Sequence, residues 1–426
     1  MLVSIFIRRA AVCSVVLALA LPSWANNSLS LDEALRTAVD RSQQVVAQDA
    51  LVQSARAQAV SAGQLPDPVL KLGVDSLPVD GAEAFNLTGG SMTMRRIGVM
   101  QDFPRAEKRQ LRAERFERDA QRALAERQTA IASVQRNTAT AWLDRYYAQA
   151  MREWLLRQME ESKLQVDAAQ AVFAAGRGSQ ADVFAARAAV VLLEDRISQI
   201  DRQLRGAGLV LARWVGAAAD RPIAGPPPWQ TLPLESALGR EHLLLHPDLQ
   251  VLAAQVSTAQ TESQLAQANT TSDWSVEVNY AQRGSAYSNM LSFGVNIPLQ
   301  LDRGNRQDRE VAAKQALVRE SQARLDDTLL SHEAEVRNLL NDWRNGKERV
   351  VRFNTQLVPL AQQRAQAALA GYRAGKADLP SVLAARRDEI DTRLQALAVE
   401  QETARLWAQL NYLTPVNGTY DLEQKP

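Results

Sequence analysis

No proline occurs between Pro104 and Pro222. Proline breaks the interior of a helix, because it lacks a backbone N–H and its ring clashes with the preceding turn. The same stretch is almost free of glycine, apart from Gly176, Gly178 and a few positions near its end. Helices of unusual length are therefore possible here. Residues 105–175 alone would span roughly 105 Å at 1.5 Å per residue.

The later part of this stretch carries an apolar stripe with alternating steps of three and four residues. This spacing is typical of the seam of a coiled coil. Gly176 to Ser179 separate the stripe from the preceding helix, so we predict a helical hairpin over about 105–215. The stripe consists of Val183, Ala186, Val190, Leu193, Ile197, Ile200, Leu204, Ala207 and Leu211.

Short motifs recur at an offset of about 200 residues, the mark of an internal repeat. LDEAL at 31–35 returns as LESAL at 234–238, and AGR at 175–177 returns as AGK at 374–376. We therefore predict two structural repeats, 26–221 and 234–415, joined by a proline-rich connector at 222–233 and followed by a tail at 416–426. Each repeat is predicted as helix, strand, strand, long helix, long helix. The fold class is mainly α with a small β part, and the second hairpin is predicted over about 304–413.

Four short segments alternate apolar and polar residues with the period of two expected of half-buried strands. The predicted strands are 68–76, 92–102, 273–282 and 290–298. Trp274 and Tyr280 bracket one apolar side about 20 Å apart, which suits the aromatic girdles of a membrane barrel. The same alternation also fits a small soluble sheet with its apolar side packed on a helix.

The first 25 residues have the pattern of a secretory signal peptide: Arg8 and Arg9, an apolar run over 10–21, and a small-residue end. The run is too short for a spanning helix. Cys13, the single cysteine, lies inside it, which indicates neither a lipidated N-terminus nor a later disulfide. Lys and Arg number 49 against 48 Asp and Glu. Without a basic excess, no nucleic-acid partner is expected.

The sequence contains no pattern that indicates catalysis. A Ser-His-Asp set, a phosphate-binding loop and a His-His-carboxylate cluster with metal-ligand spacing are all missing, so neither an enzyme nor a cofactor is expected. His242 and His246 stand four residues apart, but Pro247 follows and no third ligand is near in sequence. We interpret both as ordinary surface residues. Packing anchors are predicted at Trp142, Trp154 and Trp343.

Taken together, these features resemble the TolC family of outer-membrane efflux channels over residues 30–415. The similarity rests on the secretory signal, the duplicated unit, the Gly-Val…Pro junction from strand to long helix, and the hairpin turns. In the family, a turn glycine is followed six residues later by Asp-Val. The first turn matches with Gly176 and Asp182, whereas the second, after Gly375, has Ser381 in place of the common Asp.

The resemblance implies a homotrimer in the outer membrane of a Gram-negative bacterium. Three chains would form a twelve-stranded barrel surrounded by lipid and a twelve-helix tunnel through the periplasm. The implied partners are a periplasmic adaptor (a membrane fusion protein) and an inner-membrane RND-type pump. Segments 66–68 and 98–104 are most similar to the heavy-metal branch, the Czc and Cus type of cation exporters. The function implied is a passive exit duct, with heavy-metal cations as cargo.

Two alternatives remain open from the sequence. Within the channel class, the cargo could be drugs or a polypeptide secreted by a type I system. Outside it, the chain could be a periplasmic coiled-coil scaffold or adhesin, which would be soluble without detergent.

Candidate site residues follow from the same comparison. Asp182 and Ser381 are gate candidates, because an acidic ring in a trimer attracts cations. The simpler interpretation of Asp182 is a carboxylate stabilised by a helix dipole.

Thioethers suit Cu(I) or Ag(I), so Met92, Met94 and Met100 are soft-cation candidates, although flexible apolar filler fits equally. The predicted docking tips are Gly176, Arg177, Gly178, Gly375, Lys376 and Asp378; the predicted lumen-facing residues are Lys71, Met94, Arg96, Met100, Glu277 and Asn279.

Overall fold

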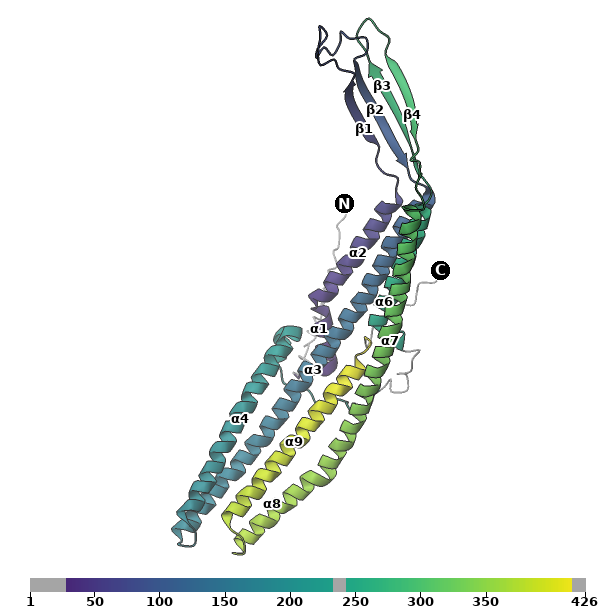
Figure 1. Cartoon of the computed structure of the whole chain (residues 1–426). Coiled ribbons are helices and arrows are strands. Elements are labelled where there is room, and N and C mark those ends of the chain that lie inside the picture. Colours follow the sequence, from purple (N-terminus) through teal and green to yellow (C-terminus); the bar gives the residue numbers. More distant parts are fainter. Residues whose placement is uncertain (1–27, 233–242, 416–426) are drawn as a thin grey trace, which may run out of the picture.

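The computed structural model describes residues 28–232 and 243–415. Figure 1 shows a long helical body with a narrow sheet at one end, so the predicted fold class is confirmed. The predicted signal peptide, the tail at 416–426, the LESAL copy at 234–238 and His242 lie outside the described residues. Among the described residues, no helix is long and apolar enough to span a membrane.

The first repeat contains four α-helices and two strands. Its third helix is unbroken over 69 residues, as the lack of proline predicts. The elements are α1 (Leu31–Asp40), α2 (Gln43–Gly63), β1 (Val69–Asp75), β2 (Met94–Phe103), α3 (Ala106–Ala174), α4 (Gln180–Val215) and the 3-10 turn η1 (Gly216–Asp220).

The second repeat follows the same order, but its long helix is interrupted. Pro359 has no N–H to donate to the carbonyl of Thr355, and a π-helical turn precedes it, a local widening that absorbs such a mismatch. The elements are α6 (Pro247–Ala268), β3 (Trp274–Gln282), β4 (Met290–Asn296), α7 (Gln307–Arg352), the π-turn η3 (Phe353–Leu357), α8 (Val358–Arg373) and α9 (Leu379–Asn411).

The four strands form one antiparallel sheet in the order β1-β2-β3-β4. Gly98 pairs with Lys71 on one side and with Asn279 on the other, and Asn279 pairs with Ser292. Residues directly opposite in an antiparallel ladder share a face. The register therefore fixes two faces that run across both repeats.

The helices pack through the predicted seams. Every residue of the α4 stripe is buried or half-buried, and so are Ile390, Leu394, Leu397, Gln401, Ala404 and Ala408 on α9. The main core lies where α1, α3, α7 and α9 meet, around the fully buried Trp142 and Trp343.

The start of α1 differs in one detail from the capping box that its sequence Ser30-x-x-Glu33 suggests. The Ser30 hydroxyl accepts the Glu33 N–H over 3.2 Å. The Glu33 carboxylate instead accepts two bonds from Arg221, at 2.6 and 3.1 Å. The Arg221 bonds lower the pKa of Glu33. This pair ties α1 to the segment that leaves the first helical hairpin.

Candidate functional site

One face of the sheet is polar and its side chains contact one another. Lys71 forms an ion pair with Glu277, and Glu277 also accepts a hydrogen bond from Asn279. Arg96 lies 3.3 Å from the Asp75 carboxylate. The register places the predicted lumen-facing residues Lys71, Met94, Arg96, Met100, Glu277 and Asn279 together on this face.

The opposite face is apolar and uncovered. Leu72 is 71% exposed and Phe293 is 75% exposed. A soluble sheet buries its apolar face and wets its polar one, whereas here the apolar side is the open one. The alternative of a soluble sheet, with its apolar face packed on a helix of the same chain, is therefore wrong. The large apolar side chains on this face are Leu70, Leu72, Val74, Ile97, Val99, Val278, Tyr280, Leu291, Phe293 and Val295. The register also places Arg95 on this face, opposite Val74 and Gln282 at the end of the sheet.

The three candidate methionines are not equivalent. Met92 is 66% exposed and precedes β2, which begins at Met94, so the predicted strand 92–102 began two residues too early. Met94 and Met100 share the polar face, but six residues of strand separate them by roughly 20 Å. They therefore cannot bind one ion together within a single chain.

The two helical hairpins end in matching turns. Gly176 has φ of +72° and Gly375 has φ of +69°, the left-handed conformation that glycine adopts without strain. The N–H of Gly176 bonds to Phe173 O and that of Arg177 bonds to Val172 O. Gly375 and Lys376 repeat this pattern with Tyr372 and Gly371. Both are Schellman caps, which present the exposed Arg177, Lys376 and Asp378 at the tips.

The helix that follows each tip is capped by the same two residue types in opposite order. Ser179 caps α4, and its hydroxyl donates to the Asp182 carboxylate over 2.7 Å. Asp378 caps α9, and it accepts bonds from the Ser381 hydroxyl and N–H, which lower its pKa. The second tip therefore still carries a carboxylate, that of Asp378, three residues before Ser381. A motif comparison at single positions records only that Ser381 replaces Asp and does not detect that the Ser and Asp have changed places.

The tips enclose a groove of about 820 Å³ between the two hairpins. Five predicted residues line it together: Arg177, Gly178, Asp182, Gly375 and Asp378. The structure therefore brings gate and docking candidates to one surface of a single chain. Beneath them, Val183 and Val382 pack in one small apolar cluster, which holds the two hairpins together.

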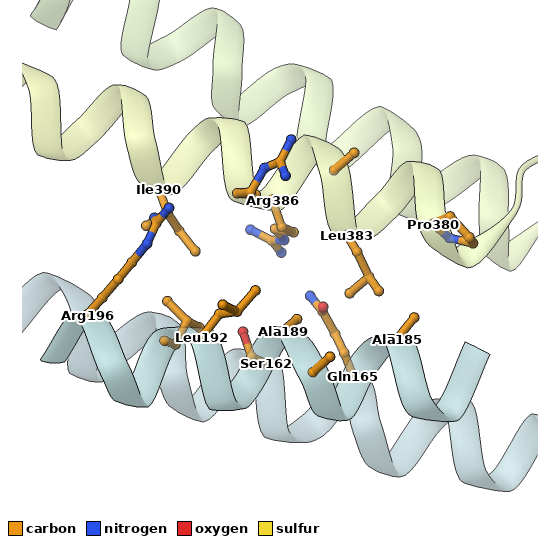
Figure 2. A pocket seen from close by; sticks show the side chains of 14 residues that line it. Ser162, Gln165, Ala185, Ala189, Leu192, Arg196, Pro380, Leu383, Arg386 and Ile390 are labelled. Atoms are coloured by element: carbon orange, nitrogen blue, oxygen red, sulfur yellow. The ribbon is translucent and has the colours of Figure 1, made fainter. Parts of the chain in front are cut away.

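A second groove, of about 440 Å³, lies further along the hairpins (Figure 2). Ala185, Ala189 and Leu192 line its α4 side, and Leu383 faces them from α9. Arg196 forms an ion pair with Asp391 at one end. Arg386 lies 3.4 Å from Glu161 and 2.8 Å from Glu389. The groove is an apolar trough, and two of the arginines that line it, Arg196 and Arg386, are paired with carboxylates.

Two clusters were not predicted from the sequence. Lys108, only 3% exposed, contacts Asp273 and the Thr271 carbonyl at the junction of helices and sheet. His246 is 4% exposed and its ring lies tilted beside that of His332, so our interpretation of His246 as a surface residue was wrong. His332 lies 86 positions along the chain, beyond the reach of any spacing rule. In the sequence, the one feature that could have pointed to the Lys108 cluster is the position of this lysine in the first turn of a predicted long helix.

A sheet with an open apolar face at the end of long helical hairpins defines an outer-membrane channel with a helical extension. The sequence matches the outer membrane efflux protein family over residues 34–217 and 238–414. The chain belongs to this family. It is therefore an outer-membrane channel protein with a periplasmic helical extension, and not an enzyme.

Solved structures agree on the fold. CusC is 17% identical, with a TM-score of 0.75, covering 90% of this chain and 91% of its own. VceC of Vibrio cholerae is 18% identical, with a TM-score of 0.72, covering 90% and 95%. MtrE of Neisseria gonorrhoeae, solved in an open state, is 16% identical, with a TM-score of 0.70, covering 90% and 88%. No curated protein sequence matches the chain significantly.

Proposed function

We propose that three copies of the chain close into one channel, which exports heavy-metal cations passively. The observation that carries this proposal is the sheet with an apolar face open to its surroundings. Four strands are too few to close a barrel, since about eight are needed. An open sheet in lipid would leave the backbone groups of β1 and β4 unpaired.

Three copies solve both problems. The order β1-β2-β3-β4 is antiparallel throughout, so β4 of one copy meets β1 of the next in the same antiparallel sense. Three sheets of four strands then give twelve strands without an edge. The polar face, with Lys71 and Glu277, would line the lumen, and the apolar face would contact lipid.

The helical body supports the same arrangement. α4 and α8 lie on opposite flanks of the chain (Figure 1). Both flanks expose apolar side chains: Phe184, Val191, Leu192, Leu209 and Val210 on α4, and Leu330, Val351 and Leu360 on α7 and α8. Exposed large apolar side chains on both flanks fit surfaces that a neighbouring copy would cover. In the trimer, the α4 flank of one copy would pack on the α7–α8 flank of the next.

The channel has no motor of its own, so a partner must deliver the cargo. We propose that the exposed tips dock on a periplasmic adaptor, which connects to an inner-membrane RND-type pump. Arg177, Lys376 and Asp378 supply charge for that contact, and the groove between the tips supplies its shape. The heavy-metal cargo is supported by the segments 66–68 and 98–104, with their similarity to cation exporters.

Adjacent positions on β4 test the lipid face. Phe293→Lys places a charge on the apolar face, where it costs about 2–4 kcal/mol at the middle of a bilayer. Ser292→Lys places the same charge on the polar face. We expect Phe293→Lys to abolish detergent-resistant trimers in the outer-membrane fraction, and Ser292→Lys to leave them intact. Equal yields of trimer for both, or a wild-type chain soluble without detergent, would instead favour a periplasmic scaffold.

The cargo needs a separate test. In a strain without its own exit ducts, the chain would be expressed with its adaptor and pump, and cell-associated metal and growth inhibition by metals and drugs would be measured. We expect metal tolerance to rise and drug tolerance to stay unchanged. A rise in drug tolerance alone would keep the duct and replace the cargo.

A further inference from the structure

Two histidines from different elements meet beside a carboxylate in the helical body. His246 is the residue that caps the start of α6, and His332 lies on α7. Their ring centroids are 4.8 Å apart. One nitrogen from each ring and one oxygen of Asp248 all lie within 4.8 Å of one another. The cluster is built from one chain and includes none of the tip or strand residues discussed above.

The His246 ring is buried yet only half used. Its Nδ1 accepts the Asp248 N–H over 3.3 Å. Its Nε2 is buried and has no hydrogen-bond partner among the described residues. A buried nitrogen without a partner is costly, and native proteins retain few of them. Nε2 is therefore the ring nitrogen that is free to bind a ligand, provided that the ring proton moves to Nδ1.

The surroundings suit a cation. Asp248 Oδ2 lies 3.8 Å from His246 Nδ1, and Glu335 lies 3.8 Å from His332 Nδ1. Thr129 on α3 donates to the other Asp248 oxygen over 2.9 Å, which orients the carboxylate. A neutral imidazole is the form that binds metal.

We propose that His246 and His332 bind one divalent transition-metal ion of the Zn²⁺ type, with Asp248 supplying the carboxylate of the site. Two imidazoles and a carboxylate suit borderline divalent ions, whereas Cu(I) and Ag(I) prefer sulfur and Mg²⁺ prefers oxygen. Metal bonds of roughly 2 Å bring donors to within about 3.5 Å of one another, so side-chain shifts of about an ångström close the site.

The proposed ion would join three helices of the body. His246 and Asp248 belong to the start of α6, His332 to α7, and Thr129 connects the carboxylate to α3. Metal binding at Nε2 requires the ring proton to sit on Nδ1. Nδ1 then no longer accepts the Asp248 N–H, so the metal bond replaces the side-chain cap of α6. The ion would thus fix the end of α6 that lies farthest from the sheet. The proposal does not depend on the cargo or on the trimer.

The test uses the full chain without an affinity tag, in detergent and stripped with EDTA. Zn²⁺ is titrated calorimetrically, and Co²⁺ binding is followed by its visible absorption. We expect one equivalent per chain, unaffected by excess Mg²⁺. His332→Gln should weaken affinity at least tenfold and remove the Co²⁺ bands. Glu333→Gln, at the next position on α7 and paired with Arg337, should bind as wild type does.

His246→Asn keeps a residue that caps helices well and removes the buried nitrogen, so it serves as the second variant. It should match His332→Gln in affinity and wild type in circular dichroism. A wild-type chain without saturable Zn²⁺ binding would overturn the proposal. Unchanged affinity and unchanged Co²⁺ bands in folded His332→Gln would also overturn it.

Discussion

Trp142 and Trp343 occupy the same place in the two repeats. Each is fully buried, and each indole N–H donates to a backbone carbonyl over 3.1 Å, that of Leu29 for Trp142 and that of Trp229 for Trp343. The tryptophans are 201 positions apart and their acceptors 200. The duplication therefore extends beyond the helices to a specific hydrogen bond, which anchors a segment near the start of each repeat onto the long helix of that repeat.

We expect Trp343 to contribute more to the free energy of unfolding than the burial of its side chain alone would. Trp343→Phe leaves the Trp229 carbonyl buried without its donor, and we expect a loss of about 2 kcal/mol. Trp343→Ala should cost about 4 kcal/mol, because it also opens a cavity. Thermal unfolding followed by circular dichroism measures both. Trp154→Phe is the control, since the Trp154 N–H has no partner among the described residues. Equal losses at Trp154 and Trp343 would contradict the role of the hydrogen bond.

Lys108 should stabilise the junction between helices and sheet. Its ammonium lies 2.9 Å from the Asp273 carboxylate and 2.6 Å from the Thr271 carbonyl. Lys108→Met removes both contacts, and we expect a loss of about 2 kcal/mol in unfolding free energy. Lys163→Met removes a mostly exposed pair with Glu160 and should cost less than about 0.5 kcal/mol. Equal losses of unfolding free energy in Lys108→Met and Lys163→Met would contradict the stabilising role of Lys108.

The tip glycines are required by backbone angle and not by space. A side chain at Gly176 or Gly375 would meet nothing within 4 Å, but φ is positive at both. Valine at either position should cost about 1–2 kcal/mol, whereas asparagine, which tolerates this conformation, should cost less. Gly208→Ala in α4 is the control and should be neutral or stabilising, because the position is helical and open.

The same variants also test docking. We expect Gly176→Val with Gly375→Val to assemble in the membrane but to lose adaptor binding, measured by cross-linking, and efflux. Unchanged efflux by a folded double variant would remove the tips from the docking surface.

Asp182 can act through its negative charge or through its hydrogen bond with Ser179, which caps the start of α4. In the gate interpretation, three Asp182 carboxylates narrow the tunnel and attract cations. Asp182→Ala should then raise single-channel conductance in bilayers and weaken divalent-cation block from the periplasmic side. Glu277→Gln and Asn279→Ala, on the sheet, should show no comparable effect. Conductance and block are both read from the same recordings.

Asp182→Asn separates the two roles. Asparagine can still accept the Ser179 hydroxyl proton but carries no charge. If the charge forms the gate, Asp182→Asn behaves like Asp182→Ala. If only the cap matters, Asp182→Asn conducts like wild type and Asp182→Ala loses about 1 kcal/mol of helix stability.

Local regularities in the sequence predicted much of this fold. Proline-free length, the three–four stripe and the period-two segments depend on neighbours within a few residues, so the sequence alone could indicate the order of helices and strands. The predicted strand 273–282 corresponds to Trp274–Gln282, for example. The Schellman turns were likewise marked by Gly176 and Gly375, because few other residues adopt positive φ.

The side-chain clusters were decided by tertiary structure. Lys108 meets Asp273 across 165 positions, and His246 meets His332 across 86, because packing of separate helices brings them together. No periodicity reports such contacts. The sequence alone determined which segments are helices and strands and that the unit is duplicated. Only the tertiary structure decided that the apolar face of the sheet stays open, because burial depends on what the rest of the chain covers.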